Sequence, residues 1–183
     1  GIGYGGSCFP KDVKALIKSG KEENFDFKIL EATEYINKKK KEILVHEIEK
    51  YFGGNIQGKK IAMWGLAFKA NTDDIREASS LDNIELLLEK GAQVVAYDAI
   101  AEENVRKILG DKIEYSKDMY SALEGADCLL IATEWSEFKN PNFELMASKL
   151  KNKVIFDGRN MFSMEQAEGS GFFYKSIGRK TVR

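Results

Sequence analysis

One cysteine stands where a thiol could act as a nucleophile. Cys8 follows a run of glycines, and Pro10, two residues later, suits the first position of a helix. The N-terminus of a helix stabilises a thiolate through the helix dipole and free backbone N–H groups, and Lys11 adds a positive charge nearby. Glycines on the approach let a substrate come close to the backbone. The residues alone leave two interpretations open: an activated nucleophile, or a buried cysteine beside a flexible loop.

A second group of polar side chains follows a buried strand. The apolar run that ends the strand Lys60–Trp64 is typical of a strand covered on both faces, and Gly65 then permits a sharp turn. The next loop carries Lys69, Asp73, Asp74 and Arg76. Open parallel sheets bind ligands at this edge, and a lysine there suits a phosphate. The stretch lacks GxGxxG or Walker spacing, so nucleotide binding and a purely structural turn both stay open.

A long helix separates these two groups. The short helix after Cys8 is expected to stop at Gly20, and residues 24–52 then predict one helix capped by Asn24 or Asp26. At about 1.5 Å per residue it would be roughly 40 Å long, more than a small domain needs. We therefore expect this helix to connect domains and to pair with a second copy of the chain.

Two features of this long helix are expected to have no chemical role. The lysines at 38–41 interrupt its apolar stripe, so we expect them to form a solvated face. His46 has no partner residue placed for catalysis and is expected to be solvated or to pack against its neighbours.

The rest of the chain alternates strands and helices. Strands are predicted at 60–64, 93–97, 112–115, 128–132, 154–156 and 172–174. Helices are predicted at 79–90, 101–109, 119–123 and 143–150. This alternation predicts an α/β fold with a doubly wound parallel sheet.

Polar residues follow four of these strands, at 69–76, 98, 133–134 and 157–160. Because the carboxyl ends of parallel strands share one edge, we expect these residues to form one site. Arg159 could present a fork to a phosphate or a base carbonyl, or form a salt bridge to Asp157 or Asp98. Asp98 ends the second strand, where Rossmann folds often place a ribose-binding acid. Without GxGxxG, a structural turn is the favoured role.

Composition narrows the function classes. The 183 residues carry 28 Lys and Arg against 29 Asp and Glu, so no strong field draws the chain to nucleic acid or to a membrane. No apolar run reaches the roughly 18 residues of a membrane span. Cys8, Cys128 and His46 cannot make a four-ligand zinc site, so no metal is expected. So few cysteines suit a reducing compartment, and we expect a cytoplasmic location. The chain opens at Gly1, inside a glycine-rich motif, and we interpret it as part of a longer protein.

Four motifs occur in a fixed order: GIGYGGSCFPKD from Gly1, GLAFKANTDDIRE from Gly65, TEW from Thr133 and DGRN from Asp157. Together they resemble the UDP-glucose 6-dehydrogenase branch of the UDP-glucose/GDP-mannose dehydrogenases. The resemblance implies three parts here: residues 1–23 as the end of the cysteine loop with a short helix, 24–57 as a central dimerisation helix and linker, and 58–183 as a Rossmann-like UDP-sugar-binding domain. The family's N-terminal NAD-binding domain would be absent from the chain.

The resemblance also implies a reaction. The family oxidises UDP-glucose at C6 to UDP-glucuronate in two hydride transfers to NAD. Cys8 would be the nucleophile, forming a thiohemiacetal and then a thioester, and Asp12 would orient or activate water. Lys11 and Arg76 would bind NAD. The substrate-binding residues would be Gly1, Ile2, Gly3, Tyr4, Gly5, Phe68, Lys69 and Arg159. The implied partners are UDP-glucose and a second copy of the chain, with no nucleic acid and no membrane.

Some positions depart from the family pattern, and two other functions stay open. Ala70 stands where a proline is usual, and Ala78-Ser79 replaces the usual Ser-Pro. The GDP-mannose 6-dehydrogenases share the cysteine and lysine motifs, although TEW and DGRN favour UDP-glucose. A non-catalytic nucleotide-sugar-binding or dimerisation module is the other alternative. Without an NAD domain, the chain alone is expected not to turn over substrate.

Overall fold

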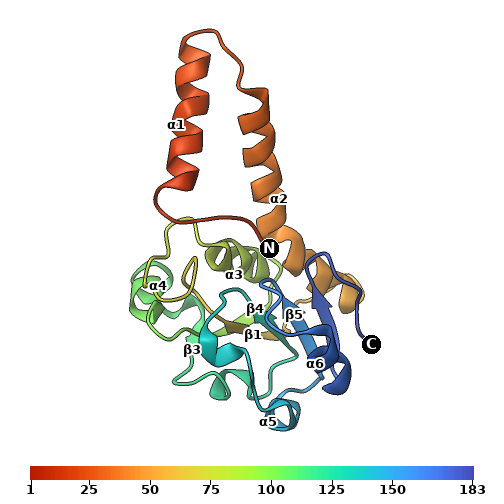
Figure 1. The fold of residues 1–183 in the computed structure, drawn as a ribbon. Coiled ribbons are helices and arrows are strands. Elements are labelled where there is room, and N and C mark those ends of the chain that lie inside the picture. The colour runs from red at the N-terminus through yellow and green to blue at the C-terminus, as the bar shows by residue number, and fades with distance from the viewer.

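Two helices stand out from a layered α/β unit in the computed structural model, which describes residues 1–183 (Figure 1). Helix α1 (Phe9–Glu22) and helix α2 (Lys28–Tyr51) form an antiparallel hairpin. The second half of α2 reaches the α/β unit, where Leu44, Val45 and Ile48 are fully buried. Helix α2 is therefore shared between the hairpin and the α/β unit.

The sheet has six strands, all parallel, in the order β3-β2-β1-β4-β5-β6. The strands are β1 (Lys60–Trp64), β2 (Gln93–Tyr97), β3 (Glu114–Tyr115), β4 (Cys128–Ile131), β5 (Val154–Asp157) and β6 (Phe173–Ser176). Strand β1 pairs with β2 on one side and with β4 on the other, so the chain changes direction across the sheet beside β1. This confirms the predicted doubly wound sheet, and such a switch point is where these folds bind ligands.

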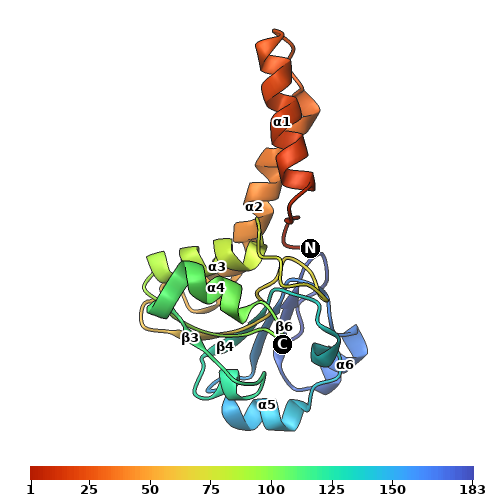
Figure 2. The same cartoon turned by 90° about the vertical axis from the view of Figure 1, so that its left-hand side faces the viewer.

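Helices cover both faces of the sheet. Helices α3 (Ser79–Glu89) and α4 (Glu102–Leu109) lie on one side, and α5 (Phe143–Lys149) lies on the other (Figure 2). Helix α6 (Met164–Gly169) packs in the same apolar cluster as α5. Alternate residues of β1 point to the two faces: Ile61 and Met63 join the cluster under α3, and Ala62 and Trp64 join the other. Both faces are therefore dry, which explains the unbroken apolar run in the sequence.

The ends of the two hairpin helices differ from the predicted ones. Helix α1 runs through Gly20 to Glu22, because Gly20 is a packing position rather than a stop: an added Cβ would lie 2.5 Å from the Phe27 ring. Helix α2 begins at Lys28 without a side-chain cap, so neither predicted cap is used. Pro10 occupies the second helical position, after Phe9.

The lysines at 38–40 of α2 are exposed, as predicted. Lys41 is buried, so the predicted solvated face is wrong for this residue. The Lys41 side chain is 6% exposed, and its ammonium lies 2.9 Å from a carboxylate oxygen of Asp82 and 3.4 Å from one of Glu77. Helix α3 packs across α2 at this turn and covers the lysine. His46 is exposed, with Glu42 and Glu49 of its own helix nearby, as expected.

Candidate active site

The glycine-rich segment before Cys8 runs along the carboxyl edge of the sheet. It begins beside β5: a Cβ added to Gly1 would lie 3.8 Å from Nη1 of Arg159. Ile2 is fully buried in the core against Gly158, where an added Cβ would lie 2.8 Å from the Ile2 Cδ1 atom. Burial of a side chain of this size contributes about 1.5–3 kcal/mol, so Ile2 anchors the segment. Any substrate contact of Ile2 would come from its backbone.

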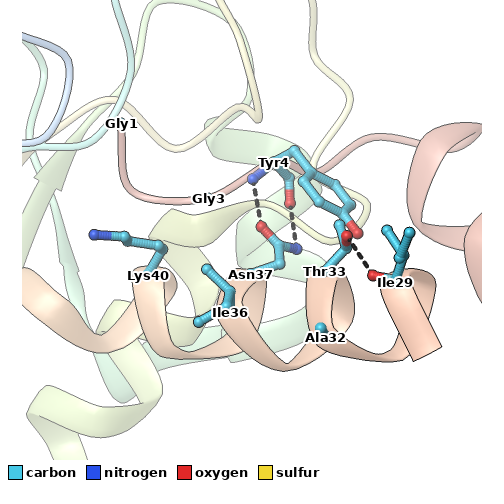
Figure 3. A pocket seen from close by; sticks show the side chains of 9 residues that line it. All are labelled: Gly1, Gly3, Tyr4, Ile29, Ala32, Thr33, Ile36, Asn37 and Lys40. Atoms are coloured by element: carbon cyan, nitrogen blue, oxygen red, sulfur yellow. Dashed lines mark hydrogen bonds between the residues drawn. The ribbon is translucent and has the colours of Figure 1, made fainter.

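Helix α2 holds the middle of the segment through one buried side chain. The Tyr4 N–H donates to Oδ1 of Asn37 at 2.7 Å, and Nδ2 of Asn37 donates to the Tyr4 carbonyl oxygen at 3.2 Å (Figure 3). Gly3, at φ +92°, comes so close that a Cβ would lie 2.9 Å from the Asn37 Oδ1 atom. The amide of Asn37 thus fixes both backbone groups of Tyr4.

The end of the segment packs against the loop after β1. The Gly6 N–H donates to the Arg76 carbonyl oxygen at 2.7 Å. Gly6 has φ +89°, and a Cβ there would lie 2.9 Å from the Phe68 ring. A Cβ on Gly5 would collide with the backbone carbonyl of Glu77. These two glycines are therefore required for the close approach that brings Cys8 to this loop.

Cys8 is exposed at the N-cap of α1, so the interpretation as a buried cysteine is wrong for this residue. The Ser7 Oγ atom lies 3.6 Å from the Cys8 Sγ atom. Lys11 and Asp12 form an exposed ion pair of 3.2 Å on the first turn. Cys128, by contrast, lies in the apolar strand β4 and is fully buried, and burial raises the pKa of its thiol. Only one of the two thiols is accessible to a substrate.

The loop after β1 offers two exposed cations. Arg76 forms a two-pronged ion pair with Asp74, with distances of 2.9 and 2.8 Å. This pair raises the pKa of the guanidinium, and the nearby Cys8 side chain adds a smaller effect in the same direction. Lys69 is exposed, has no carboxylate partner, and lies 5.3 Å from the Phe68 ring centroid. Lys69 is therefore free to meet an anionic ligand.

Arg159 is largely buried and connects three segments. Its Nε donates to the Ala132 carbonyl oxygen at 2.7 Å, and its Nη2 donates to the Phe68 carbonyl oxygen at 3.3 Å. The carboxylate that pairs with it belongs to Glu134, at 3.2 Å, so the predicted pairing with Asp157 or Asp98 is wrong. Burial lowers the pKa of this guanidinium, against the opposite effect of the Glu134 charge. Arg159 thus fixes the loop that carries Phe68 beside the start of the glycine segment.

Asp98 has a structural role, as we expected because the sequence lacks a GxGxxG motif. Its carboxylate accepts bonds from the backbone N–H groups of Leu66, Ala67, Ile100 and Ala101 and from the indole of Trp135, at 2.6–3.1 Å. These five donors occupy both oxygens, so Asp98 shapes the turn after β1 rather than facing a ligand.

The structure thus brings Arg159, the glycine segment and the loop of Phe68 and Arg76 to one sheet edge. Asp98 was expected to share this site, but its carboxylate is fully used by the turn after β1. Sequence reasoning missed Asn37, Lys14, Lys41 and Glu77, which hold that arrangement together. A polar residue inside an apolar helical stripe was the only signal for Asn37. No group of three His, Cys, Asp or Glu side chains is placed to hold a metal ion. None of the helices has the length and apolarity required to cross a bilayer.

The fold and this edge define a nucleotide-binding type of α/β domain joined to a helical hairpin with an accessible cysteine. Residues 62–164 match the UDP-binding domain of the UDP-glucose/GDP-mannose dehydrogenase family, and residues 1–39 match its central domain. The chain belongs to the UDP-glucose/GDP-mannose dehydrogenase family.

Several relatives match almost the whole chain. UDP-glucose 6-dehydrogenase TuaD of Bacillus subtilis is 45% identical over 100% of this chain and 40% of its own length. UDP-glucose 6-dehydrogenase of Pseudomonas aeruginosa is 41% identical over 98% of this chain and 41% of its own length. The chain therefore spans about two fifths of these relatives.

Solved structures show the same arrangement of elements. A UDP-glucose dehydrogenase from Pyrobaculum islandicum matches with a TM-score of 0.80 and 35% identity, over 88% of this chain and 35% of that one. A UDP-D-ManNAc dehydrogenase from Pyrococcus horikoshii matches with a TM-score of 0.78 and 30% identity, over 98% of this chain and 40% of that one.

Proposed function

We propose that the chain is the cysteine-bearing and UDP-sugar-binding part of a longer NAD-dependent UDP-glucose 6-dehydrogenase. The observation that carries this proposal is the placement of Cys8: an exposed thiol at a helix N-terminus, tied through Gly6 to the loop with Lys69 and Arg76. The 45% identity to a UDP-glucose 6-dehydrogenase over the whole chain supports the same activity.

The UDP-sugar would lie along the sheet edge. The free ammonium of Lys69 and the Phe68 ring would meet the nucleotide diphosphate, and Arg159 would add a charge at the far end of the edge. Gly1, Ile2, Gly3, Tyr4 and Gly5 would line the sugar's side of this site, mostly through backbone atoms, since the three glycines have no side chain to keep the sugar away. The absence of a competing carboxylate on Lys69 supports its role.

The chemistry would take place on the Cys8 sulfur. The thiolate adds to the C6 aldehyde carbon, and the carbonyl oxygen takes up a proton to give a thiohemiacetal. Loss of a hydride from C6 and a proton from its oxygen leaves a thioester. Water then attacks the thioester carbon, and the sulfur departs as a thiolate while the sugar becomes a carboxylate. Asp12, on the first turn of α1, would orient or activate that water.

NAD, when bound, would supply the hydride acceptor for both oxidations. Two cationic side chains of this chain fit a dinucleotide phosphate: Lys11 and Arg76 are 72% and 68% exposed, beside the accessible thiol. Each is paired with a neighbouring carboxylate, so an incoming phosphate would share these cations with Asp12 and Asp74.

A homodimer through α2, in the cytoplasm, completes the proposal. In the half of α2 that lies outside the α/β unit, Ile29 is 82% exposed, Tyr35 is 62% exposed and Ile36 is 52% exposed. Ile29 and Ile36 also line a hollow of about 690 Å³ beside Gly3 and Tyr4 (Figure 3). Covering this apolar surface with a second copy would remove it from water.

The decisive experiment compares substrates and cysteines. The longer protein should form two NADH per UDP-glucose. Cys8→Ala should abolish NADH formation, whereas Cys128→Ala should still oxidise UDP-glucose. Turnover of GDP-mannose in preference to UDP-glucose would show that GDP-mannose, and not UDP-glucose, is the substrate. Normal turnover by Cys8→Ala would refute the covalent route.

A further inference from the structure

We propose that Glu77 is a positioning residue for Cys8: its carboxylate fastens helix α1, which starts at Cys8, onto the loop after β1. The role of this fastening in catalysis rests on the proposed function. One Glu77 oxygen lies 2.7 Å from the Lys14 ammonium on α1, and the other lies 3.4 Å from the Lys41 ammonium on α2. A single carboxylate thus bridges both helices of the hairpin.

The bond from Lys14 is the only polar side-chain link between α1 and any residue beyond α2. The other ion pairs of α1 either stay within the helix or reach Glu31 and Glu34 on α2. The other polar contact between this part of the chain and the loop after β1 is the backbone bond from the Gly6 N–H to the Arg76 carbonyl oxygen. Removing the bond from Lys14 would therefore free α1 to move relative to the loop that carries Arg76.

Lys41 holds the other oxygen of the Glu77 carboxylate in place. Its ammonium is buried and must be paired, because an isolated buried charge is strongly unfavourable. Asp82 supplies one partner at 2.9 Å, and Glu77 supplies the second. The bond to Lys14 is also the largest of the effects that lower the pKa of Glu77, so the carboxylate is ionised at neutral pH.

The backbone of Glu77 has an unusual conformation. Its φ is +53°, a left-handed value that residues other than glycine and asparagine rarely adopt. This conformation turns the Glu77 carbonyl against Gly5, while the preceding Arg76 carbonyl accepts the Gly6 N–H. The backbone of Glu77 therefore contacts the segment three residues before Cys8, and its side chain contacts α1 six residues after Cys8.

A nitroxide on Cys8 tests the fastening without any turnover. Cys8 is exposed and Cys128 is buried, so a thiol-specific label reacts with Cys8 alone. The label's electron paramagnetic resonance spectrum should show restricted motion in the parent chain. Glu77→Gln and Lys14→Met should each narrow the lines, and the double variant should narrow them no further. Lys18→Met, one turn along α1 and paired only with Glu22, is the matched control and should match the parent.

Turnover by the longer protein then tests the consequence for catalysis. Glu77→Gln and Lys14→Met should lower kcat about tenfold to a hundredfold, because a small misplacement of a reacting group has effects of this size, with little change in the KM for UDP-glucose. Lys18→Met should keep the parent kcat. A merely structural role for Glu77 would lower stability and leave the kcat of the folded fraction unchanged.

Parent-like spectra for Lys14→Met would overturn the proposal, even if Glu77→Gln failed to fold. Parent-like kcat in both variants would also overturn it. If the parent itself did not oxidise UDP-glucose, the proposed function would fail, and the spectra would still decide whether Glu77 holds Cys8 in place.

Discussion

The backbone N–H of Gly6 donates to the carbonyl oxygen of Arg76 at 2.7 Å, joining two segments that are 70 residues apart in the chain. One segment ends at Cys8, and the other carries the exposed cations after β1. The thiol and the proposed ligand-binding loop therefore share one rigid connection. Substitutions that disturb this connection should affect chemistry more than they affect folding of the sheet.

Gly6→Ala should test the close approach. The change forces a Cβ to within 2.9 Å of the Phe68 ring at φ +89°. We expect kcat of the longer protein to fall about a hundredfold, as for other small displacements of a reacting group. Gly178→Ala is the control, because Gly178 has φ +71° with open space around it. Equal losses in the two variants would mean that backbone strain alone explains the effect.

Asn37→Ala should release Tyr4 from α2. Both bonds to the Tyr4 backbone would be lost from a largely buried site, so the free energy of unfolding should fall by about 1–3 kcal/mol. Urea unfolding of the chain measures this, and amide hydrogen exchange should become faster at Tyr4. Lys38→Ala, on the next residue but exposed, should stay within about 0.5 kcal/mol of the parent. A parent-like Asn37→Ala would show that the two bonds do not hold the segment.

Lys69→Met should weaken UDP binding to the chain without changing its stability. An exposed ionic contact contributes at most about 1 kcal/mol, so the Kd should rise about fivefold, and less at high salt. Isothermal titration calorimetry with UDP measures the change. The control is Lys153→Met, an exposed lysine before β5 at the opposite edge of the sheet. Unchanged affinity in Lys69→Met would place the diphosphate elsewhere.

Because of the ion pair between Glu77 and Lys14, the free energy of unfolding should decrease as the pH falls into the acid range. Lys14, the largest cause, lowers the pKa of Glu77 below its ordinary 4.5, so the stabilisation is complete above that value and is lost as pH falls through the lower, folded value. The parent should exceed Glu77→Gln by about 0.2–1 kcal/mol at pH 7, since the carboxylate is partly exposed. The gap should close in acid. A gap that widens in acid would contradict the pair.

Much of the sheet could be predicted because its signals are local. Strands β1 and β2 were predicted to the residue, since each is an apolar run bounded by a turn. Helix α6 was missed because its six residues are too short to show a period. It begins at a capping box in which Ser163 and Gln166 bond each other's backbone N–H groups, a signal that was present in the sequence.

The candidate site was predictable only in part. Cys8 stood out because a proline marked the helix start beside it. Glu77, Lys41 and Asn37 did not, because each acts through contacts with residues more than 30 positions away, and no spacing rule reveals such contacts. The lysine run looked like a solvated face, and only the packing of α3 across α2 shows that Lys41 is buried.

The most direct measurement is the detection of the covalent sugar on the thiol. The longer protein, mixed with UDP-glucose and NAD and quenched in acid, should carry a UDP-glucuronosyl group on the peptide that contains Cys8 and none on the peptide that contains Cys128. Asp12→Asn should increase the amount trapped, because hydrolysis of the thioester would slow. Rapid formation of UDP-glucuronate with no adduct on Cys8 in either protein would contradict the account.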